Sequence, residues 1–583
     1  MDSSGQRPHM KMLQGEKYLW RIPLKNKQLV FKLAAAYNLS FPVVQSLISR
    51  GFTTNELLDS FLFSSFEKDV AHPSLLEGAQ SSVDRILHAV EKQEQILIFG
   101  DYDVDGITSS ALMMAALLPL GARVNFFLPH RVRDGYGIST KIIERAAKNN
   151  YKLIITVDNG ITAFEPAIRA KELGVDLIIT DHHRPHEKLP NAFAIVDPNQ
   201  KSCTYPYKHF AGVGVAFKLL SLLYEQRGLQ LPEKAYELLL LGTIADVVPL
   251  TGENRFWVRY CLNRINGCSS YPFSVLKKNG KVVKDSISST DIGFCIAPQI
   301  NALGRLEDPR QGVKFLLGSD KKEVDEVGRI LFELNQARKA VERSIFEEVE
   351  QEIEQKRIDL DKENIIIAAS RSWAPGVIGL VASRIVSAYG KPTLLFHLGK
   401  DGVAKGSCRS IPEFNIFDAL KSASNILKSF GGHSFAAGLS LPIDNLSDLK
   451  EHLETLVSEQ LTEFDLKQKI ELDASVMLSD LTRKFVDDMS LLEPFGNENR
   501  QPAFYLKDVV QVKKPTLLKD LHVKCSVFSD GVIKPLIFFN RPELFEKFLN
   551  HGEKPFHIAA HVTENHWAGR VSVELLGIDV MFK

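Results

Sequence analysis

Three aspartates alternate in the run from Asp101 to Asp105, which reads Asp-Tyr-Asp-Val-Asp and follows a short apolar stretch. One carboxylate could cap a helix that begins near Ile107, but three exceed the needs of any cap. Carboxylates this close repel one another unless a cation lies among them. The run from Asp101 through Asp103 to Asp105 therefore indicates a metal site.

A carboxylate also follows each of four predicted strands, either directly or after one small residue. These carboxylates belong to Asp101, Asp158, Asp181 and Asp197. Ligands of open α/β sheets bind beyond the carboxyl ends of the strands, so the sheet would gather these acids at one edge. An aspartate after a strand can also be a simple turn residue, and Asp197, which precedes a proline, is interpreted as one.

Two adjacent histidines, His182 and His183, narrow the choice of metal. Neighbouring side chains on a regular element cannot face one point, so we expect one to be a ligand and the other to lie near the substrate. Carboxylate and imidazole ligands together fit Mn²⁺ well and Mg²⁺ less well, whereas zinc more often recruits cysteine. A two-metal site of this kind hydrolyses phosphodiesters, and the chain has no Walker A or Gly-x-Gly-x-x-Gly motif that would indicate other chemistry.

Asp246 is a lone acid at the end of an apolar run. A buried carboxylate without a partner is costly, so Asp246 either pairs with a cationic side chain or binds the metal. The residues alone leave these alternatives open.

The apolar pattern predicts a doubly wound α/β domain with a parallel sheet, because strands and helices alternate between residues 94 and 200. The predicted strands are 96–99, 124–128, 153–157, 177–179 and 193–196, and the predicted helices between them are 107–120, 140–149 and 163–173. A helical pattern over 321–356 is long enough to bridge two domains, although a core helix of one large domain would show it too. A second, smaller α/β pattern covers 364–460, and short alternating runs beyond 470 indicate a β-barrel or sandwich.

Length and composition bound the class of protein. A chain of 583 residues needs three or four domains. Zero net charge, from 71 basic and 71 acidic residues, counts mildly against a nucleic-acid binder but leaves room for a locally basic channel. Six scattered cysteines, no secretion signal and no apolar run of membrane-spanning length predict a cytoplasmic protein without a disulfide framework.

Four motifs together resemble those of the DHH phosphoesterase superfamily: residues 100–106, 157–160, 181–183 and 245–246. Further segments are similar to the RecJ family of single-strand-specific exonucleases, namely 129–131 with 135–137, 300–305, 376–379 with 382–384, 405–410, 431–433 and 493–496 with Asn499 and Pro502. The resemblance covers about residues 75 to 583. It implies a DHH domain over 71–320, a DHH-associated substrate-binding domain over 357–462 and an oligonucleotide-binding (OB) β-barrel over 463–583. The sequence pattern adds a connecting helix over 321–356 and an N-terminal helical region over 1–70, to which no role is assigned.

The resemblance also implies roles for individual residues. Two Mn²⁺ or Mg²⁺ ions would be held by Asp103, Asp105, Asp158, His182 and Asp246. Hydrogen bonding and water activation would fall to Asp101, Asp181 and His183. Substrate would be bound by Arg131, Arg305, Ser407, Arg409, Gly432 and His433.

Simpler interpretations of the substrate-binding set exist. Arg409 could pair with Glu413, the two glycines before His433 could mark only a tight turn, and Arg131 and Arg305 could form surface ion pairs. Ala374 stands where the family usually has histidine, a departure expected to affect substrate contact or domain packing rather than the chemistry.

The segment from Tyr505 to Lys534 contains six lysines and three aspartates, which gives it a local net charge of +3. With Phe504, Tyr505 and Phe528 as stacking faces or core residues, they predict salt-sensitive binding of single strands. The activity that the resemblance implies is 5′ to 3′ hydrolysis of single-stranded DNA to mononucleotides in recombination and repair, by a monomer, alongside a single-strand-binding protein and a helicase. The alternatives are a phosphodiesterase of short oligonucleotides or cyclic dinucleotides and a non-catalytic DNA-binding scaffold.

Overall fold

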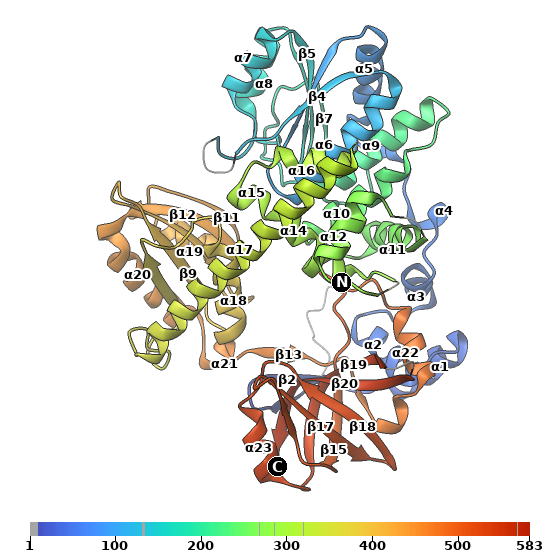
Figure 1. The fold of residues 1–583 in the computed structure, drawn as a ribbon, viewed down its shortest axis with the longest axis vertical. Coiled ribbons are helices and arrows are strands. Elements are labelled where there is room, and N and C mark those ends of the chain that lie inside the picture. Colours follow the sequence, from blue (N-terminus) through green and yellow to red (C-terminus); the bar gives the residue numbers. More distant parts are fainter. Residues whose placement is uncertain (1–9, 131–133, 268, 285, 319, 568–569) are drawn as a thin grey trace. The chain divides into compact units, whose positions relative to one another are not determined.

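The structure is a computed structural model that describes residues 10–583 except for 131–133, 268, 285, 319 and 568–569 (Figure 1). The chain divides into two compact units. One, here the DHH unit, contains residues 63–339 and the short segment 494–500. The other contains the described residues up to 62, then 340–493 and 501–583.

The DHH unit is built on a parallel sheet with the strand order β4-β3-β5-β6-β7. The strands are β3 (Gln95–Gly100), β4 (Arg123–Phe127), β5 (Tyr151–Val157), β6 (Asp176–Thr180) and β7 (Ala194–Val196). The chain leaves β3 to form β4 on one side and then crosses to β5 on the other. This reversal makes a topological switch point between β3 and β5, where doubly wound sheets bind their ligands.

Helices cover both faces of this sheet, as predicted (Figure 1). Alternate residues of β3 point to opposite faces: Ile96 and Ile98 enter one core cluster, and Leu97 and Phe99 enter the other. The first cluster includes α5 (Ala79–Glu91), α6 (Val104–Leu117), α9 (Gly212–Gln226) and α10 (Glu233–Ala245), and the second includes α7 (Thr140–Lys148) and α8 (Phe164–Glu172). Further helices are α11 (Gly252–Gly267), α12 (Tyr271–Asn279), α14 (Ala297–Asn301), α15 (Leu303–Leu306) and α16 (Arg310–Leu317).

The long helix α17 runs over Lys321–Glu354, and the division between the two units falls inside it, after Lys339. Its 34 residues span about 50 Å at ~1.5 Å per residue. The predicted bridging helix is thus present, and it ends two residues before the predicted boundary.

The second α/β region has a five-stranded sheet in the order β11-β12-β10-β9-β8. Only β8 and β9 pair in parallel; the other pairs are antiparallel. The strands are β8 (Ile366–Ser370), β9 (Thr393–Leu398), β10 (Val403–Arg409), β11 (Ser429–His433) and β12 (Ala436–Pro442), and the helices are α18 (Ile378–Tyr389), α19 (Ile416–Ser422) and α20 (Leu446–Gln460).

The C-terminal region is a closed β-barrel, which decides between the predicted barrel and sandwich. Its strands follow the order β15-β19-β20-β18-β17, and a further pairing of β15 with β17 closes the ring. The strands are β15 (Phe504–Gln511), β17 (His522–Ser529), β18 (Val532–Phe538), β19 (Phe556–Trp567) and β20 (Arg570–Phe582), preceded by α22 (Arg483–Ser490).

The N-terminal region differs from the helical region predicted for 1–70. Strands β1 (Met10–Gln14) and β2 (Leu19–Pro23) form a hairpin before the helices, and β2 also pairs with β13 (Lys469–Glu471). The buried Asp579 carboxylate accepts hydrogen bonds from the backbone of Lys17 and Tyr18 and from the Trp20 indole. The hairpin is therefore held by partners more than 400 residues away, which no local pattern reveals. The helices that follow are α1 (Lys27–Tyr37), α2 (Phe41–Ser49), α3 (Asn55–Leu62) and α4 (Phe66–Asp69).

Candidate metal centre and substrate-binding residues

The acids that follow three adjacent strands meet at the switch point. Asp101 follows β3, Asp158 follows β5 and Asp181 follows β6, and all three side chains are buried. Metal-ligating atoms converge in three overlapping groups, each within 4.8 Å. The groups are Asp101 with Asp103 and Asp158, Asp105 with His182 and Asp246, and Asp158 with Asp181, His182 and His183.

Asp103 and Asp105 are fixed by backbone N–H groups. Asp103 caps helix α6, because its Oδ1 accepts a hydrogen bond from Gly106 at 3.1 Å. The buried Asp105 carboxylate accepts from the backbone of Gly212 at 2.5 Å and Val213 at 2.8 Å, at the start of α9. A Cβ on Gly212 would lie 2.6 Å from the Asp158 Cβ, so this close approach requires glycine.

His182 faces the carboxylates of three other residues. Its Nε2 lies 3.1 Å from Asp158 Oδ1, 3.7 Å from Asp246 Oδ2 and 3.9 Å from Asp105 Oδ2. The Asn199 amide donates to the His182 carbonyl at 2.7 Å and helps to hold that backbone. An imidazole nitrogen among three carboxylates is a donor set suited to Mn²⁺.

Asp181 makes so many hydrogen bonds that it orients its neighbours. Its Oδ1 accepts from the backbone of His182 and His183 and from His183 Nδ1 at 2.7 Å, and its Oδ2 accepts from Ile161 at 2.9 Å. The Tyr136 hydroxyl lies 3.4 Å from the same His183 nitrogen. The two histidines thus have separate partners, with His182 directed at Asp158 and His183 held by Asp181.

The structure places the two remaining acids differently. The buried Oδ2 of Asp246 makes no hydrogen bond among the described residues, and the nearest nitrogen in an ion-pair contact is that of His182. Such an atom fits a bound cation better than a cationic side chain. Asp197 lies beyond β7 and accepts from the Asn199 backbone at 2.7 Å, as a turn-forming aspartate does.

Burial and crowding shift the titration of this cluster. Burial, together with the negative charge of Asp103, raises the pKa of Asp105 to about 7. Burial and neighbouring carboxylates also raise the pKa of Asp158 and Asp246. Burial lowers the pKa of His182 to about 4, so its ring is neutral at physiological pH. Burial alone would lower the pKa of His183, but the hydrogen bond and charge of Asp181 outweigh it and raise that pKa to about 9.

These shifts predict how metal binding depends on pH. Because the pKa of Asp105 rises from 3.8 to about 7 on folding, the folded metal-free protein binds more protons than the unfolded chain in that window. The contribution of Asp105 to stability is therefore greatest below its unfolded pKa and is lost as pH rises through the folded one. A metal ion competes with those protons, so Mn²⁺ should raise the melting temperature more at pH 8 than at pH 5.5. Differential scanning fluorimetry tests this, and equal shifts at both pH values would contradict it.

Arg131 and Arg305 are the two arginines predicted to contact substrate. Arg131 lies outside the described residues. Arg305 belongs to α15, where a Cβ on Gly304 would come within 2.1 Å of the Tyr102 carbonyl. The backbone of α15 therefore lies directly against the aspartate run, and Arg305 follows Gly304 in the chain.

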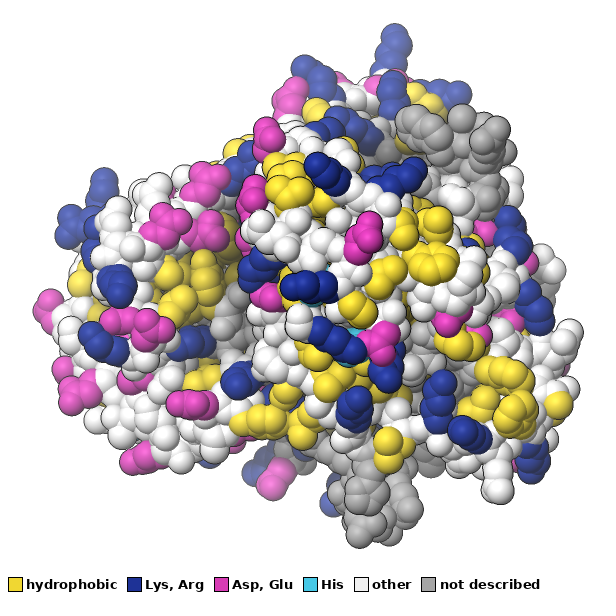
Figure 2. Space-filling model, turned by 90° about the horizontal axis from the view of Figure 1, so that it is seen from below, with side chains coloured by type: hydrophobic (Ala, Val, Ile, Leu, Met, Phe, Trp, Pro, Cys, Tyr) yellow, Lys and Arg dark blue, Asp and Glu magenta, His cyan; other side chains and the backbone are white. Residues whose placement is uncertain are grey.

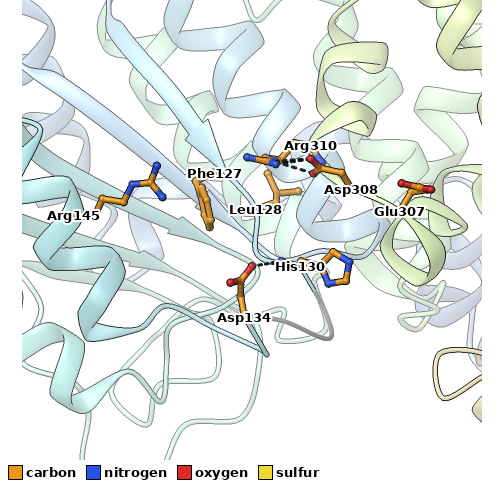
Figure 3. A pocket seen from close by; sticks show the side chains of 8 residues that line it. All are labelled: Phe127, Leu128, His130, Asp134, Arg145, Glu307, Asp308 and Arg310. Carbon is orange, nitrogen blue, oxygen red and sulfur yellow. Dashed lines mark hydrogen bonds and ion pairs between the residues drawn. The ribbon is translucent and has the colours of Figure 1, made fainter.

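A polar pocket of about 440 Å³ opens at the carboxyl end of β4 (Figure 3). Arg310 makes a forked ion pair with Asp308, and Asp134 accepts from the His130 backbone. Phe127 ends strand β4, the neighbour of the strand that leads to Asp101. The pocket thus lies at the same edge of the sheet as the metal-ligating groups.

Ser407 and Arg409 lie together against the first turn of α18. The Arg409 guanidinium donates to the Ser407 hydroxyl at 3.2 Å, and a Cβ on Gly379 would lie 2.7 Å from that hydroxyl. Among the described residues no carboxylate forms an ion pair with Arg409. Glu413, the partner considered from the sequence, pairs with Lys469 at 2.7 Å instead. Burial lowers the pKa of Arg409. An arginine guanidinium without a carboxylate partner is suited to binding phosphate.

Gly432 and His433 belong to a strand rather than a tight turn. In the sheet, His433 pairs with Ala436, which pairs in turn with Arg409. His433 and Arg409 therefore share one row, with only a small alanine between them. Gly432 has φ +147°, and a Cβ there would lie 2.4 Å from the Ala436 carbonyl, so this position requires glycine. Ala374 is half-buried and packs against a core that includes Trp373 and Val377.

Comparisons with known proteins agree with this architecture. Three family models match: the DHH family N-terminal domain over 95–243, the DHHA1 domain over 362–459 and the RecJ OB domain over 472–579. The chain is 35% identical to the single-stranded-DNA-specific exonuclease RecJ of Bacillus subtilis, over 96% of this chain and 70% of that one. It is 33% identical to the RecJ of Dickeya dadantii, over 86% of this chain and 90% of that one. The chain belongs to the RecJ family.

A solved RecJ structure shows the same fold. The chain matches the crystal structure of RecJ in complex with Mn²⁺ from Thermus thermophilus with a TM-score of 0.81 and 26% identity, over 96% of this chain and 79% of that one. The DHH match contains the RecJ aspartate run and the histidine pair, whereas Asp246 lies three residues beyond it. Among the described residues, no helix is both long and apolar enough to cross a membrane.

The sequence did not reveal which residues hold Asp105 and His183 in place. The N–H groups of Gly212 and Val213 fix Asp105, and the Tyr136 hydroxyl lies beside His183. The glycines at the start of the apolar helix α9 were the available signal. Their role depends on a contact across more than 100 residues, so spacing alone does not show it.

Proposed function

We propose that this protein is a metal-dependent, single-strand-specific DNA exonuclease that acts from 5′ to 3′ and releases mononucleotides in recombination and repair. The observation that carries the proposal is the convergence of Asp105, Asp158, His182 and Asp246 at the switch point of the sheet. The names of the B. subtilis and D. dadantii relatives supply the substrate class. Cytoplasmic location, a monomeric state, and a single-strand-binding protein and a helicase as partners belong to the same proposal.

The proposed ligands of two Mn²⁺ or Mg²⁺ ions are Asp103, Asp105, Asp158, His182 and Asp246. The donor set fits, because Asp105 and Asp158 are buried and Asp246 Oδ2 makes no hydrogen bond among the described residues. When bound, two divalent ions neutralise phosphate charge and lower the pKa of water. The T. thermophilus relative was solved with each of these metals.

Three further residues act around these ligands. Asp181 holds the His183 ring through Nδ1, so that its Nε2 can donate a hydrogen bond to a phosphate oxygen. Because the pKa of His183 is raised to about 9, the ring carries its proton at neutral pH. Asp101 lies within 4.8 Å of ligating atoms of Asp103 and Asp158 and helps to orient the water that attacks.

We propose that Ser407 and Arg409 bind the 5′-terminal phosphate of the strand, together with Gly432 and His433 of the same sheet. The half-buried guanidinium beside the first turn of α18 supports this assignment. Arg305, and Arg131 outside the described residues, contact the backbone of the strand. Recognition of a terminal phosphate gives the enzyme its polarity.

The barrel binds the strand mainly through lysines. Phe504 and Tyr505 are buried, so of the three predicted stacking residues only Phe528 is exposed. Lys534 donates to the Leu481 carbonyl, and Lys524 and Lys507 lie 3.8 Å from Glu574 and 3.5 Å from Asp508, respectively. Lys513, Lys514 and Lys519 are exposed and have no ion pair among the described residues. On the face drawn in Figure 2, Lys and Arg side chains are spread among Asp and Glu, in keeping with the zero net charge.

Replacing both Lys513 and Lys514 by alanine should weaken binding of single strands regardless of sequence. Each lost phosphate contact should lower the slope of log affinity against log salt by about 1. Fluorescence anisotropy across a salt series measures the slope. An unchanged slope would show that this loop does not contact the strand.

An end-blocking assay tests the proposed activity. Single strands blocked at the 5′ end, at the 3′ end or at neither are incubated with Mn²⁺, and products are resolved by size. We expect mononucleotides from free 5′ ends and no cleavage when that end is blocked. Cleavage from the 3′ end would refute the polarity, turnover of dinucleotides alone would favour a short-oligonucleotide phosphodiesterase, and binding without cleavage would favour a scaffold.

A further inference from the structure

The turn that follows Asp246 has a conformation that its sequence disfavours. Helix α10 ends at Ala245, and Val247 has φ +58°. This left-handed position after a helix is normally occupied by glycine, and a β-branched residue there is an outlier. The Val247 side chain is 66% exposed, so core packing does not impose the conformation. Something else must hold it.

The direction of the Asp246 side chain depends on this backbone more than the directions of Asp103, Asp105 and Asp181 depend on theirs. Asp103, Asp105 and Asp181 are each fixed by hydrogen bonds from backbone N–H groups. Asp246 makes no side-chain hydrogen bond among the described residues, and His182 Nε2 lies 3.7 Å away. The direction of its carboxylate is therefore set by the backbone at the end of α10 and by the turn at Val247.

One residue from a distant part of the chain brackets this turn. The Asn497 side-chain amide donates to the Val247 carbonyl at 2.8 Å. The Asn497 carbonyl accepts from the backbone N–H of Leu250, also at 2.8 Å. The two bonds span the four residues that follow Asp246 and close the left-handed turn from both sides.

The segment that carries Asn497, residues 494–500, is itself well held; we call it the strap. Gly496 and Asn499 exchange two backbone hydrogen bonds, and the Asn499 amide donates to the Pro494 carbonyl at 2.8 Å. Ser289 donates to the Phe495 carbonyl at 2.6 Å. The strap packs with the DHH unit, although the chain before and after it belongs to the other unit. It can therefore act as a fixed support for the turn.

We propose that Asn497 is a positioning residue for Asp246: it holds Val247 in its left-handed conformation and so keeps the carboxylate directed at the metal centre. The inference rests on the proposed metal site. If Val247 relaxed to negative φ, the chain would leave α10 in another direction and the last turn, with Asp246, would move. Loss of the bracket should therefore weaken metal binding.

The test compares full-length Asn497→Ala, Val247→Gly and the double variant. Mn²⁺ binding is followed by the electron paramagnetic resonance signal of free Mn²⁺, and activity is titrated against Mn²⁺. We expect Asn497→Ala to raise the dissociation constant of the Mn²⁺ ion that Asp246 helps to hold by roughly tenfold, as for residues that orient metal ligands. The effect on kcat at saturating Mn²⁺ should be smaller. Glycine adopts positive φ without strain, so Val247→Gly in the double variant should restore most of the affinity.

Two controls separate the possible failures. Asn279→Ala removes a similar bond, from an asparagine amide to the Gly328 carbonyl at 2.8 Å, in the same unit but away from the metal ligands, and it should leave Mn²⁺ affinity unchanged. Asp246→Asn should weaken Mn²⁺ binding; if it does not, the proposed metal site itself is wrong. If Asp246→Asn weakens binding but Asn497→Ala behaves like Asn279→Ala, or if glycine at 247 gives no rescue, the positioning role is overturned.

Discussion

Asp158→Asn should abolish most hydrolysis while the protein stays folded. The Asp158 carboxylate belongs to two of the three converging groups and lies 3.1 Å from His182 Nε2. Removing its charge should lower kcat/KM by roughly a thousandfold, or about 4 kcal/mol, as expected for loss of a ligand in a two-metal site. Asparagine is a better replacement than alanine, because Asp158 has φ +61° and asparagine tolerates that conformation.

Asp197→Asn is the matched control. Asp197 is also a buried acid at the carboxyl edge of the same sheet, but it accepts a hydrogen bond in a turn, which asparagine can do equally well. We expect its activity to stay within a few-fold of the unmodified protein, with both variants melting near the same temperature. If the two substitutions reduced activity equally, the distinction between metal ligand and turn residue would be wrong.

Arg409→Lys should remove most of the preference for strands that carry a 5′-phosphate. The guanidinium is half-buried beside the first turn of α18 and pairs with no carboxylate among the described residues. Lysine keeps the charge but cannot form the planar two-donor contact with phosphate. Loss of a charge-assisted contact worth about 2 kcal/mol should reduce kcat/KM by roughly thirtyfold. The measurement compares 5′-phosphorylated with 5′-hydroxyl strands.

The control for this prediction is Glu413→Gln. Glu413 lies in the same domain as Arg409. Its substitution breaks the ion pair with Lys469 and should leave the preference for a 5′-phosphate intact. The phosphate assignment would be contradicted if Arg409→Lys slowed both kinds of strand by the same factor, because that result indicates a general structural effect.

The sequence predicts the DHH sheet well because its information is local. Each strand is a short apolar run, an acid follows four of the five, and parallel strands of this kind leave little choice of arrangement. The metal-ligand set came from the family resemblance, not from spacing. The structure adds the reason that Asp101, Asp158 and Asp181 meet: they follow strands that are neighbours in the sheet.

Other features depend on contacts between distant residues and could not be predicted. The hairpin at 10–23 pairs with β13 and is held by Asp579, so its local sequence resembles an ordinary polar terminus. The possible pairing of Arg409 with Glu413 was reasonable from spacing, but Glu413 lies beside Lys469. The bracket of Asn497 on Val247 joins residues 250 positions apart.

The central claim is that the acidic cluster hydrolyses DNA through bound divalent ions. The most direct test follows mononucleotide release from a single strand in Mn²⁺, then after excess EDTA, then after Mn²⁺ is restored, with Asp158→Asn in parallel. We predict release in Mn²⁺, none in EDTA, full recovery on restoring the metal, and almost none from Asp158→Asn throughout. Release that continued at the same rate in EDTA would contradict the account.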